Sequence, residues 1–91
     1  MDAEGIIEYV ITEHASLQMD RRSISLEQVR YVLGEPEQRF SVREGRDVLQ
    51  SRLRTEGMLY LVRVFVDIDR KPAEVITVYR TSRIEKYWRS I

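Results

Sequence analysis

The first third of the chain shows one short apolar run followed by two helical patterns. Residues 6–11 are mostly apolar and β-branched, which predicts a strand, although their spacing would also suit the start of a longer helix. A helix over residues 12–21 is expected next, because its first residue is a threonine that can act as N-cap. Ser25 and Gln28 have the spacing of a capping box, so a second helix should begin there and end at Gly34.

From residue 38 onward, apolar and polar residues alternate with a period of two, which is typical of strands. Four strands are expected, over residues 38–43, 47–55, 58–68 and 73–80. Ser82 and Glu85 repeat the capping-box spacing, so a final helix is expected after them. The pattern predicts an α+β fold in a single domain, residues 1–91, with two N-terminal helices and one C-terminal helix. Its sheet should be antiparallel and four-stranded, with the short N-terminal strand added and helices covering one face.

The two-residue turn Glu56-Gly57 fixes the register of the strands on either side of it. One face then holds a mostly apolar set: Leu49, Ser51, Leu53, Tyr60, Val62 and Val64. The opposite face holds a polar row that includes Gln50, Arg52, Arg54 and Arg63. A three-residue loop over 70–72 would place Tyr79 opposite Arg63 and would add Thr77 to the polar row. The core would then receive Ile76 and Val78.

Charge is distributed unevenly along the chain, although its total is zero. The chain has 15 Lys and Arg against 15 Asp and Glu, so the total predicts no general attraction to nucleic acids or anionic membranes. Residues 75–91, however, hold four cations and one acid, which makes this end an anion-seeking segment. Thirteen of the 15 cations are arginine, whose planar group suits phosphate, but a GC-rich genome or surface ion pairs would give the same composition.

The sequence contains no long apolar segment and no cysteine. An apolar run of about 18 residues would be needed to span a bilayer, and the acidic start of the chain lacks the features of a secretory signal. The absence of disulfides in so small a chain fits the cytosol. We therefore expect a cytoplasmic protein without a membrane partner.

The polar row is a candidate site for an anion. Guanidinium groups that lie close together repel one another unless an anion or a carboxylate lies among them, and no acid falls on the row within the predicted pairs. An ordinary solvent-facing sheet face, with arginine stacked on tyrosine, would contain the same residues. His14, the only histidine, could exchange a proton near neutral pH. With one histidine, no cysteine and no glycine-rich phosphate loop, we expect neither a metal nor a cofactor.

Three segments carry a resemblance to a known family: HASLQMDRRSIS (residues 14–25), VITVYRTS (75–82) and TSRIEKYW (81–88). They resemble small bacterial domains of unknown function with the pattern H-A-x-x-R-M-x-x-R-x-I-S, then T-x-Y, and an ending similar to T-S-K-I-x-K-Y-W. The resemblance covers about residues 9–89. That family is usually grouped with RelE-like toxins and with the wider barnase, EndoU, colicin and RelE set of metal-independent ribonuclease folds. Gln18 stands where the pattern commonly has arginine, so activity would be weak or lost if that arginine contacts phosphate.

The resemblance implies a RelE-like fold and a metal-independent endoribonuclease, the toxin of a toxin–antitoxin pair. Tyr79 would then take the proton of the RNA 2′-hydroxyl, and His14 would act as the acid or as an alternative base. Arg52 and Arg63 would stabilise the developing charge. Substrate-binding candidates are Arg22, Gln50, Arg54, Thr77, Arg80 and Lys86. The expected partners are RNA, including ribosome-bound mRNA, and an antitoxin protein.

Two other functions fit the same residues. A non-catalytic module of this fold would use the arginine face to hold RNA or an acidic partner, and its affinity would fall with salt. A protein adaptor would instead accept an added strand at an exposed sheet edge, and its binding would not need the arginines.

Overall fold

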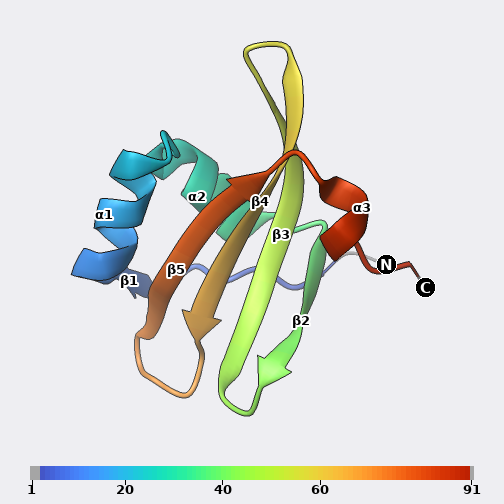
Figure 1. The fold of residues 1–91 in the computed structure, drawn as a ribbon. Coiled ribbons are helices and arrows are strands. Elements are labelled where there is room, and N and C mark those ends of the chain that lie inside the picture. The colour runs from blue at the N-terminus through green and yellow to red at the C-terminus, as the bar shows by residue number, and fades with distance from the viewer. Residues whose placement is uncertain (1–2, 91) are drawn as a thin grey trace.

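In residues 3–90, which the computed structural model describes, five strands and three helices follow one another in the order predicted (Figure 1). The elements are β1 Tyr9–Ile11, α1 Glu13–Arg21, α2 Leu26–Gly34, β2 Gln38–Arg43, β3 Arg46–Thr55, β4 Met58–Asp67, β5 Ala73–Thr81 and α3 Ile84–Tyr87. The strand predicted over residues 6–11 occupies only the last three of them. The four later strands begin and end within one residue of the predicted positions.

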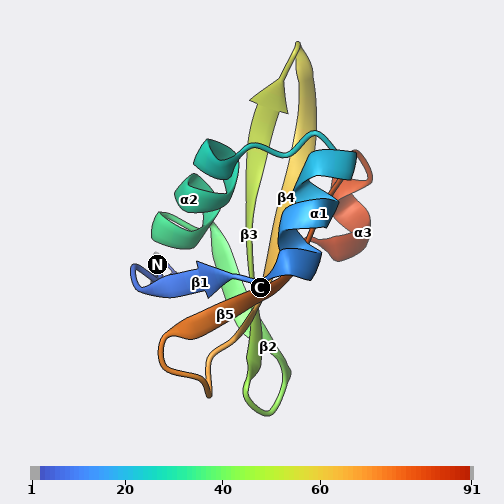
Figure 2. The ribbon, with the colours of Figure 1, turned by 90° about the vertical axis from the view of Figure 1, so that its left-hand side faces the viewer.

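The sheet is mixed, whereas the pattern predicted an antiparallel one. Its strand order is β1-β5-β4-β3-β2, with β1 parallel to β5 and every other neighbouring pair antiparallel. The chain leaves β1 at one edge of the sheet, and α1 and α2 carry it across a face before β2 forms the other edge (Figure 2). Thr12 extends the parallel contact, because its backbone N–H donates to the Val75 carbonyl at 3.1 Å.

The hairpin between β3 and β4 has the predicted register. Glu56 and Gly57 adopt positive φ angles of 51° and 81°, as this kind of two-residue turn requires. Gln50 on β3 therefore lies opposite Arg63 on β4, and Arg63 lies opposite Tyr79 on β5. Three side chains of the predicted polar row thus come from three neighbouring strands.

The connection between β4 and β5 differs from the predicted three-residue loop. Residues 68–72 connect the strands, and a β-bulge at Ile76 shifts the register within β5. Val75 rather than Ile76 is fully buried in the core as a result. Beyond the bulge, the register is the one that sets Tyr79 opposite Arg63.

The first two helices begin at the predicted caps. Thr12 Oγ1 accepts from the backbone N–H of Ala15 at 3.2 Å. The capping box of Ser25 and Gln28 is confirmed, because each side chain accepts from the other residue's backbone N–H, at 3.1 and 3.0 Å. Both helices pack on one face of the sheet (Figure 2). The core between them is formed by Ala15, Met19, Ile24, Val29, Val32, Leu33, Leu49, Val62, Val64, Val66, Val75 and Val78.

The third helix differs from the prediction in both its start and its position. Arg83 is its N-cap, and no side chain closes the cap, so the predicted capping box of Ser82 and Glu85 does not form. Glu85 is then the second helical residue, whereas a capping box needs the third. α3 covers the face opposite α1 and α2, where its Tyr87 lies over the sheet, so helices cover both faces rather than one (Figure 1). None of the helices described in residues 3–90 is long and apolar enough to cross a membrane.

Candidate functional site

A buried arginine links three strands on the face that α3 covers. Arg63 on β4 is 8% exposed. Its Nε donates to Gln50 Oε1 on β3 at 2.8 Å, and its Nη1 donates to the Tyr79 hydroxyl on β5 at 2.5 Å. These bonds confirm that the three side chains share one face. We refer to this group and its aromatic neighbours as the Arg63 cluster: Gln50, Arg63, Phe65, Tyr79 and Tyr87.

Aromatic rings surround the Arg63 guanidinium group. Its central carbon lies 4.5 Å from the ring centre of Tyr87, 5.2 Å from that of Phe65 and 5.6 Å from that of Tyr79. Cation–π attraction stabilises the cation but supplies no negative charge. Among the described residues, no carboxylate pairs with Arg63 and its Nη2 makes no hydrogen bond. The cluster therefore keeps a positive charge and one unused donor group.

Gln50 supports Arg63 from within the protein and does not face a ligand. Its side chain is fully buried, and its Nε2 donates to Gln38 Oε1 at 2.7 Å and to the Tyr87 carbonyl at 3.2 Å. Gln38 in turn donates to the Arg89 carbonyl at 2.6 Å and accepts from the Arg89 N–H at 3.2 Å. We therefore assign Gln50 a positioning role where the sequence predicted substrate contact. Gln38 was missed, although the pairing of β2 with β3 sets it directly opposite Gln50.

Arg52, the second arginine predicted to be catalytic, lies outside the Arg63 cluster. Its Nε and Nη2 donate to the two carboxylate oxygens of Glu37 at 3.1 and 2.8 Å, and its backbone N–H donates to the same carboxylate at 2.7 Å. The side-chain hydrogen bond from Arg52 lowers the pKa of Glu37, and the same bond raises the pKa of Arg52. No acid was expected on the row within the predicted strand pairs, and Glu37 reaches Arg52 from outside them, because it lies in the loop before β2.

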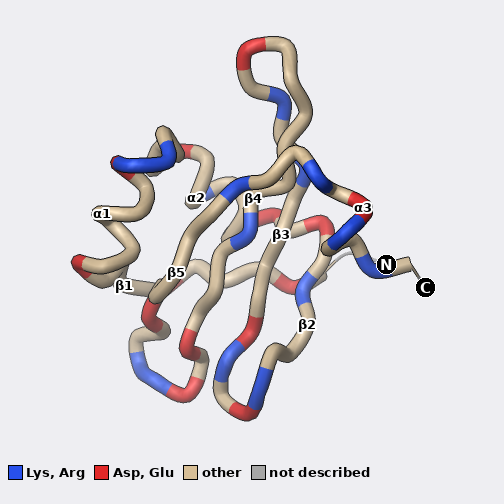
Figure 3. The backbone as a smooth tube through the Cα atoms, in the orientation of Figure 1, with Lys and Arg blue, Asp and Glu red and all other residues tan. Residues whose placement is uncertain are grey.

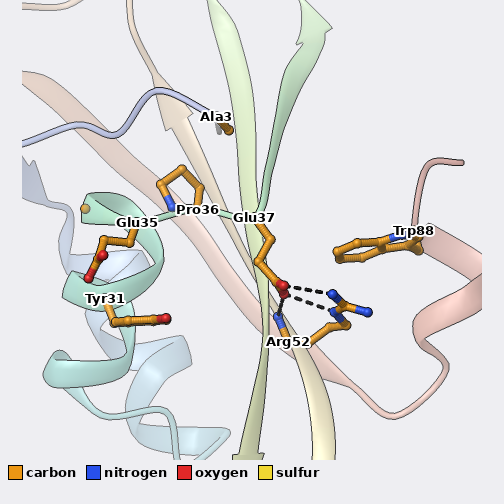
Figure 4. A pocket seen from close by; sticks show the side chains of 8 residues that line it. Ala3, Tyr31, Glu35, Pro36, Glu37, Arg52 and Trp88 are labelled. Carbon is orange, nitrogen blue, oxygen red and sulfur yellow. Dashed lines mark hydrogen bonds and ion pairs between the residues drawn. The ribbon is translucent and has the colours of Figure 1, made fainter. Parts of the chain in front are cut away.

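The Glu37–Arg52 ion pair lines a pocket of about 560 Å³ (Figure 4). Tyr31 of α2 and Trp88, which directly follows α3, lie on opposite sides of this pocket, with the ion pair between them. The guanidinium carbon of Arg52 is 4.1 Å from the Trp88 ring centre, so Arg52 stacks on the indole while Glu37 holds its edge. Sequence patterns do not bring these two aromatic residues together, because α2 and α3 are far apart along the chain.

A comparison with models of known protein families identifies the family to which this chain is related. The model of a domain of unknown function, DUF4258, matches residues 11–80. The chain belongs to the DUF4258 family. This result confirms the expected relation to domains of unknown function, while searches of curated proteins and of solved structures found no match. Within the DUF4258 match lie Arg63 and Tyr79, whereas α3 lies beyond its end.

The edge of β5 beyond β1 in this DUF4258 domain is covered by side chains of α1 and of its C-cap, Arg22. Gln18 Oε1 accepts from the Val78 N–H at 2.9 Å, and Arg22 Nη1 donates to the Val78 carbonyl at 2.8 Å. Gln18 is the residue that departs from the family pattern, and an arginine there could not accept from this N–H. The guanidinium carbon of Arg22 lies 6.0 Å from the Tyr79 ring centre, so the structure brings this predicted binding residue to the cluster.

His14 is not in contact with the Arg63 cluster. It is exposed on α1, and within residues 3–90 its imidazole makes no hydrogen bond. Because it precedes Gln18 by four residues, it lies on the same side of α1, toward the edge of β5. No group of three His, Cys, Asp or Glu side chains in the described part of the chain could hold a metal ion.

Two more of the predicted binding residues border the cluster. Thr77 on β5 pairs with Phe65 and shares the face of Tyr79. Lys86 on α3 has its ammonium nitrogen 5.5 Å from the Tyr87 ring centre. Positive positions continue from the end of β5 through α3 (Figure 3). The anion-seeking end of the sequence therefore lies next to the cluster in space.

The last two predicted binding residues lie away from the cluster. Arg54 is in the β3–β4 hairpin, where its Nη1 donates to the Gly57 carbonyl at 3.3 Å. Arg80 stacks on Tyr60 at 4.4 Å from the ring centre. It follows Tyr79 by one residue and therefore faces α1 and α2 rather than α3. The structure places neither cation near Arg63.

Proposed function

We propose that this domain is a RelE-like, metal-independent endoribonuclease that binds an RNA phosphate at the Arg63 cluster. The observation that carries the proposal is the largely buried Arg63 side chain, which has no carboxylate partner among the described residues and whose unbonded Nη2 is not fully buried. A buried cation without a counter-charge is costly, and a bound phosphate would supply the negative charge. Tyr79, hydrogen-bonded to the same guanidinium, would lie against that phosphate.

The proposed reaction moves two protons around the phosphate. A base removes the proton of the 2′-hydroxyl, the 2′-oxygen forms a bond to phosphorus, and the bond from phosphorus to the 5′-oxygen breaks as an acid protonates that oxygen. Arg63 stabilises the charge that develops on the phosphate oxygens, because its position is fixed before RNA binds. In this proposal Tyr79 takes the first proton, and His14, on the neighbouring side of α1, supplies the second.

Cleavage of a labelled RNA in the presence of a metal chelator tests the proposal. Tyr79→Phe keeps the stacked ring but loses the hydroxyl, and its rate should fall by about 10²–10³. Arg63→Lys keeps the charge but loses the two-donor geometry, and a similar loss is expected once circular dichroism shows that it folds. Tyr60→Phe removes a phenol outside the cluster and should cleave like wild type. Absence of cleavage by wild type, or equal rates for the two tyrosine variants, would contradict the proposal.

We further propose that the enzyme acts in the cytoplasm as the toxin of a toxin–antitoxin pair. Its substrate would be RNA, free or as ribosome-bound mRNA, and its protein partner an antitoxin. The resemblance of the segments around His14, Tyr79 and Trp88 supports this setting. Induced expression should then arrest growth, and Tyr79→Phe should relieve the arrest at an equal protein level. Arrest that persists in the Tyr79→Phe variant would argue against a nuclease toxin.

A non-catalytic RNA-binding module is the second candidate. Two features favour it: Glu37 already neutralises Arg52, and His14 makes no hydrogen bond within the described residues. Such a module would still bind RNA at Arg63. The logarithm of its binding constant would fall linearly with the logarithm of the salt concentration. RNA binding that Arg63→Lys weakens, together with unchanged RNA after prolonged incubation, would select the module over the nuclease.

A further inference from the structure

We propose that the pocket between Tyr31 and Trp88 binds one unpaired nucleobase of a single-stranded RNA. The pocket has a volume of about 560 Å³ and is lined by the Glu37–Arg52 ion pair between the two aromatic residues (Figure 4). The inference rests on the proposed function, because it places a base of the RNA whose phosphate lies at Arg63. The proposal gives a role to Tyr31 and Trp88, whose position around a pocket is not explained by core packing.

The aromatic residues supply stacking surfaces at the entrance of the pocket. Tyr31 is 49% exposed although it is a large aromatic side chain, and Trp88 is half-buried. Aromatic side chains stack on every kind of base, because each base presents a π-face. The indole already accepts a planar cation, since the Arg52 guanidinium lies 4.1 Å from its centre. Arg52 therefore holds the Trp88 ring in place before any base enters.

The charges of the pocket favour a base over a phosphate. Glu35 and Glu37 line it together with one cation, Arg52, so acids exceed cations by one. Glu37 keeps its negative charge at neutral pH, because its hydrogen bond to Arg52 lowers its pKa. Carboxylate oxygens accept hydrogen bonds from the amino groups of adenine, cytosine and guanine and from the ring N–H of guanine and uracil, so every base offers them a donor.

The pocket lies close enough to the Arg63 cluster for one RNA strand to reach both. Arg52 is two residues from Gln50 along β3, and Tyr79 is two strands away from Gln50 across the sheet. Strand spacing and residue rise place the Cα atoms of Arg52 and Tyr79 about 12 Å apart. Trp88 also directly follows Tyr87, which covers Arg63. Because the C-terminal segment lies between the two sites, a strand of a few nucleotides that passes over α3 would connect them.

Fluorescence of Trp88 tests the proposal directly, because it is the only tryptophan in the chain. The probes are 2′-O-methyl hexanucleotides of each base, which lack the attacking hydroxyl, and an abasic oligomer with the same phosphates. The base-containing oligomers should quench Trp88 and the abasic oligomer should not. Tyr31→Ala should raise the Kd for the base-containing oligomers, measured by the quenching, by about 5- to 150-fold, which is the range for one stacked base. Tyr31→Phe, which keeps the ring, and Leu26→Ala, on the same helix but outside the pocket, should bind like wild type.

Each other outcome has a defined meaning. Equal effects of the abasic and base-containing oligomers, or equal affinities for wild type and Tyr31→Ala, would overturn the proposal. Quenching by arginine amide but not by oligonucleotides would also overturn it, and would indicate a basic side chain of a protein partner. Cleavage of unmodified RNA by a protein that shows no base-dependent quenching would leave the nuclease proposal standing alone. Base-dependent quenching in a protein that does not cleave RNA would support the pocket and remove the nuclease.

Discussion

Replacing Gln50 by leucine removes the amide that positions the Arg63 cluster without opening a large cavity. Gln50 is fully buried and bonds to Arg63, Gln38 and Tyr87. Leucine has a similar volume, so the main effect is the loss of partners for polar groups that remain. The charged Nε of Arg63 would lose its acceptor in a site that is 8% exposed, which costs about 1–3 kcal/mol. Tyr87 is half-buried, so the loss of this bond by its carbonyl adds less.

The expected total for Gln50→Leu is a loss of about 2–4 kcal/mol in the free energy of unfolding. For a chain of this size, that loss lowers the melting temperature by roughly 10–20 °C. Urea unfolding followed by far-UV circular dichroism and by Trp88 fluorescence measures the effect on the whole fold and on the segment after α3. Gln28→Leu is the matched control, because it removes a half-buried glutamine from a capping box and should cost about 1 kcal/mol. A loss below about 1 kcal/mol for Gln50→Leu, or one equal to the control, would refute the positioning role.

Three further predictions concern other contacts. At pH 7 the free energy of unfolding should be larger for wild type than for Glu37→Gln. The difference should vanish as the pH falls through the lowered pKa of Glu37, because a carboxyl group with a lowered pKa stabilises the fold only above that pKa. Urea unfolding at pH 7 and at a pH below that pKa checks this. Ser25→Ala should lower the unfolding free energy by about 1 kcal/mol in the same assay, because it removes the N-cap of α2. Gln18→Leu should speed hydrogen exchange at the Val78 amide, measured by NMR, because that amide loses its acceptor.

The faces of the strands could be predicted because local residues determine them. The Glu56-Gly57 turn fixes the β3–β4 register, and alternation along each strand then decides which side chains share a face. The bulge at Ile76 could not be predicted, because one extra residue in a strand leaves no separate sequence signal. Tyr79 was nevertheless placed correctly opposite Arg63, since the error in the loop and the omission of the bulge cancel.

The surroundings of the site could not be predicted because they depend on segments that are distant in sequence. Alternation shows which face a strand residue occupies, but not which loop or helix covers that face. Glu37 reaches Arg52 across 15 positions, and Gln50 reaches Tyr87 across 37. The capping-box spacing of residues 82–85 was present without the box, because the chain turns into α3 one residue later than expected. A motif of this kind predicts that a helix forms more reliably than it predicts the residue at which the helix begins.

The C-terminal segment decides from which side an anion can reach Arg63. Gln38 and Gln50 hold this segment by hydrogen bonds to the backbone of Tyr87 and Arg89. The segment therefore covers the cluster on the side of β2 and β3. On the opposite side, β1 pairs with only the first three residues of β5, so the edge beyond them is covered by side chains of α1 rather than by a strand. An anion therefore approaches Arg63 from the side of β5 and α1. The same segment carries Trp88 to the pocket on its other side, so an RNA strand bound at both places would have to cross α3.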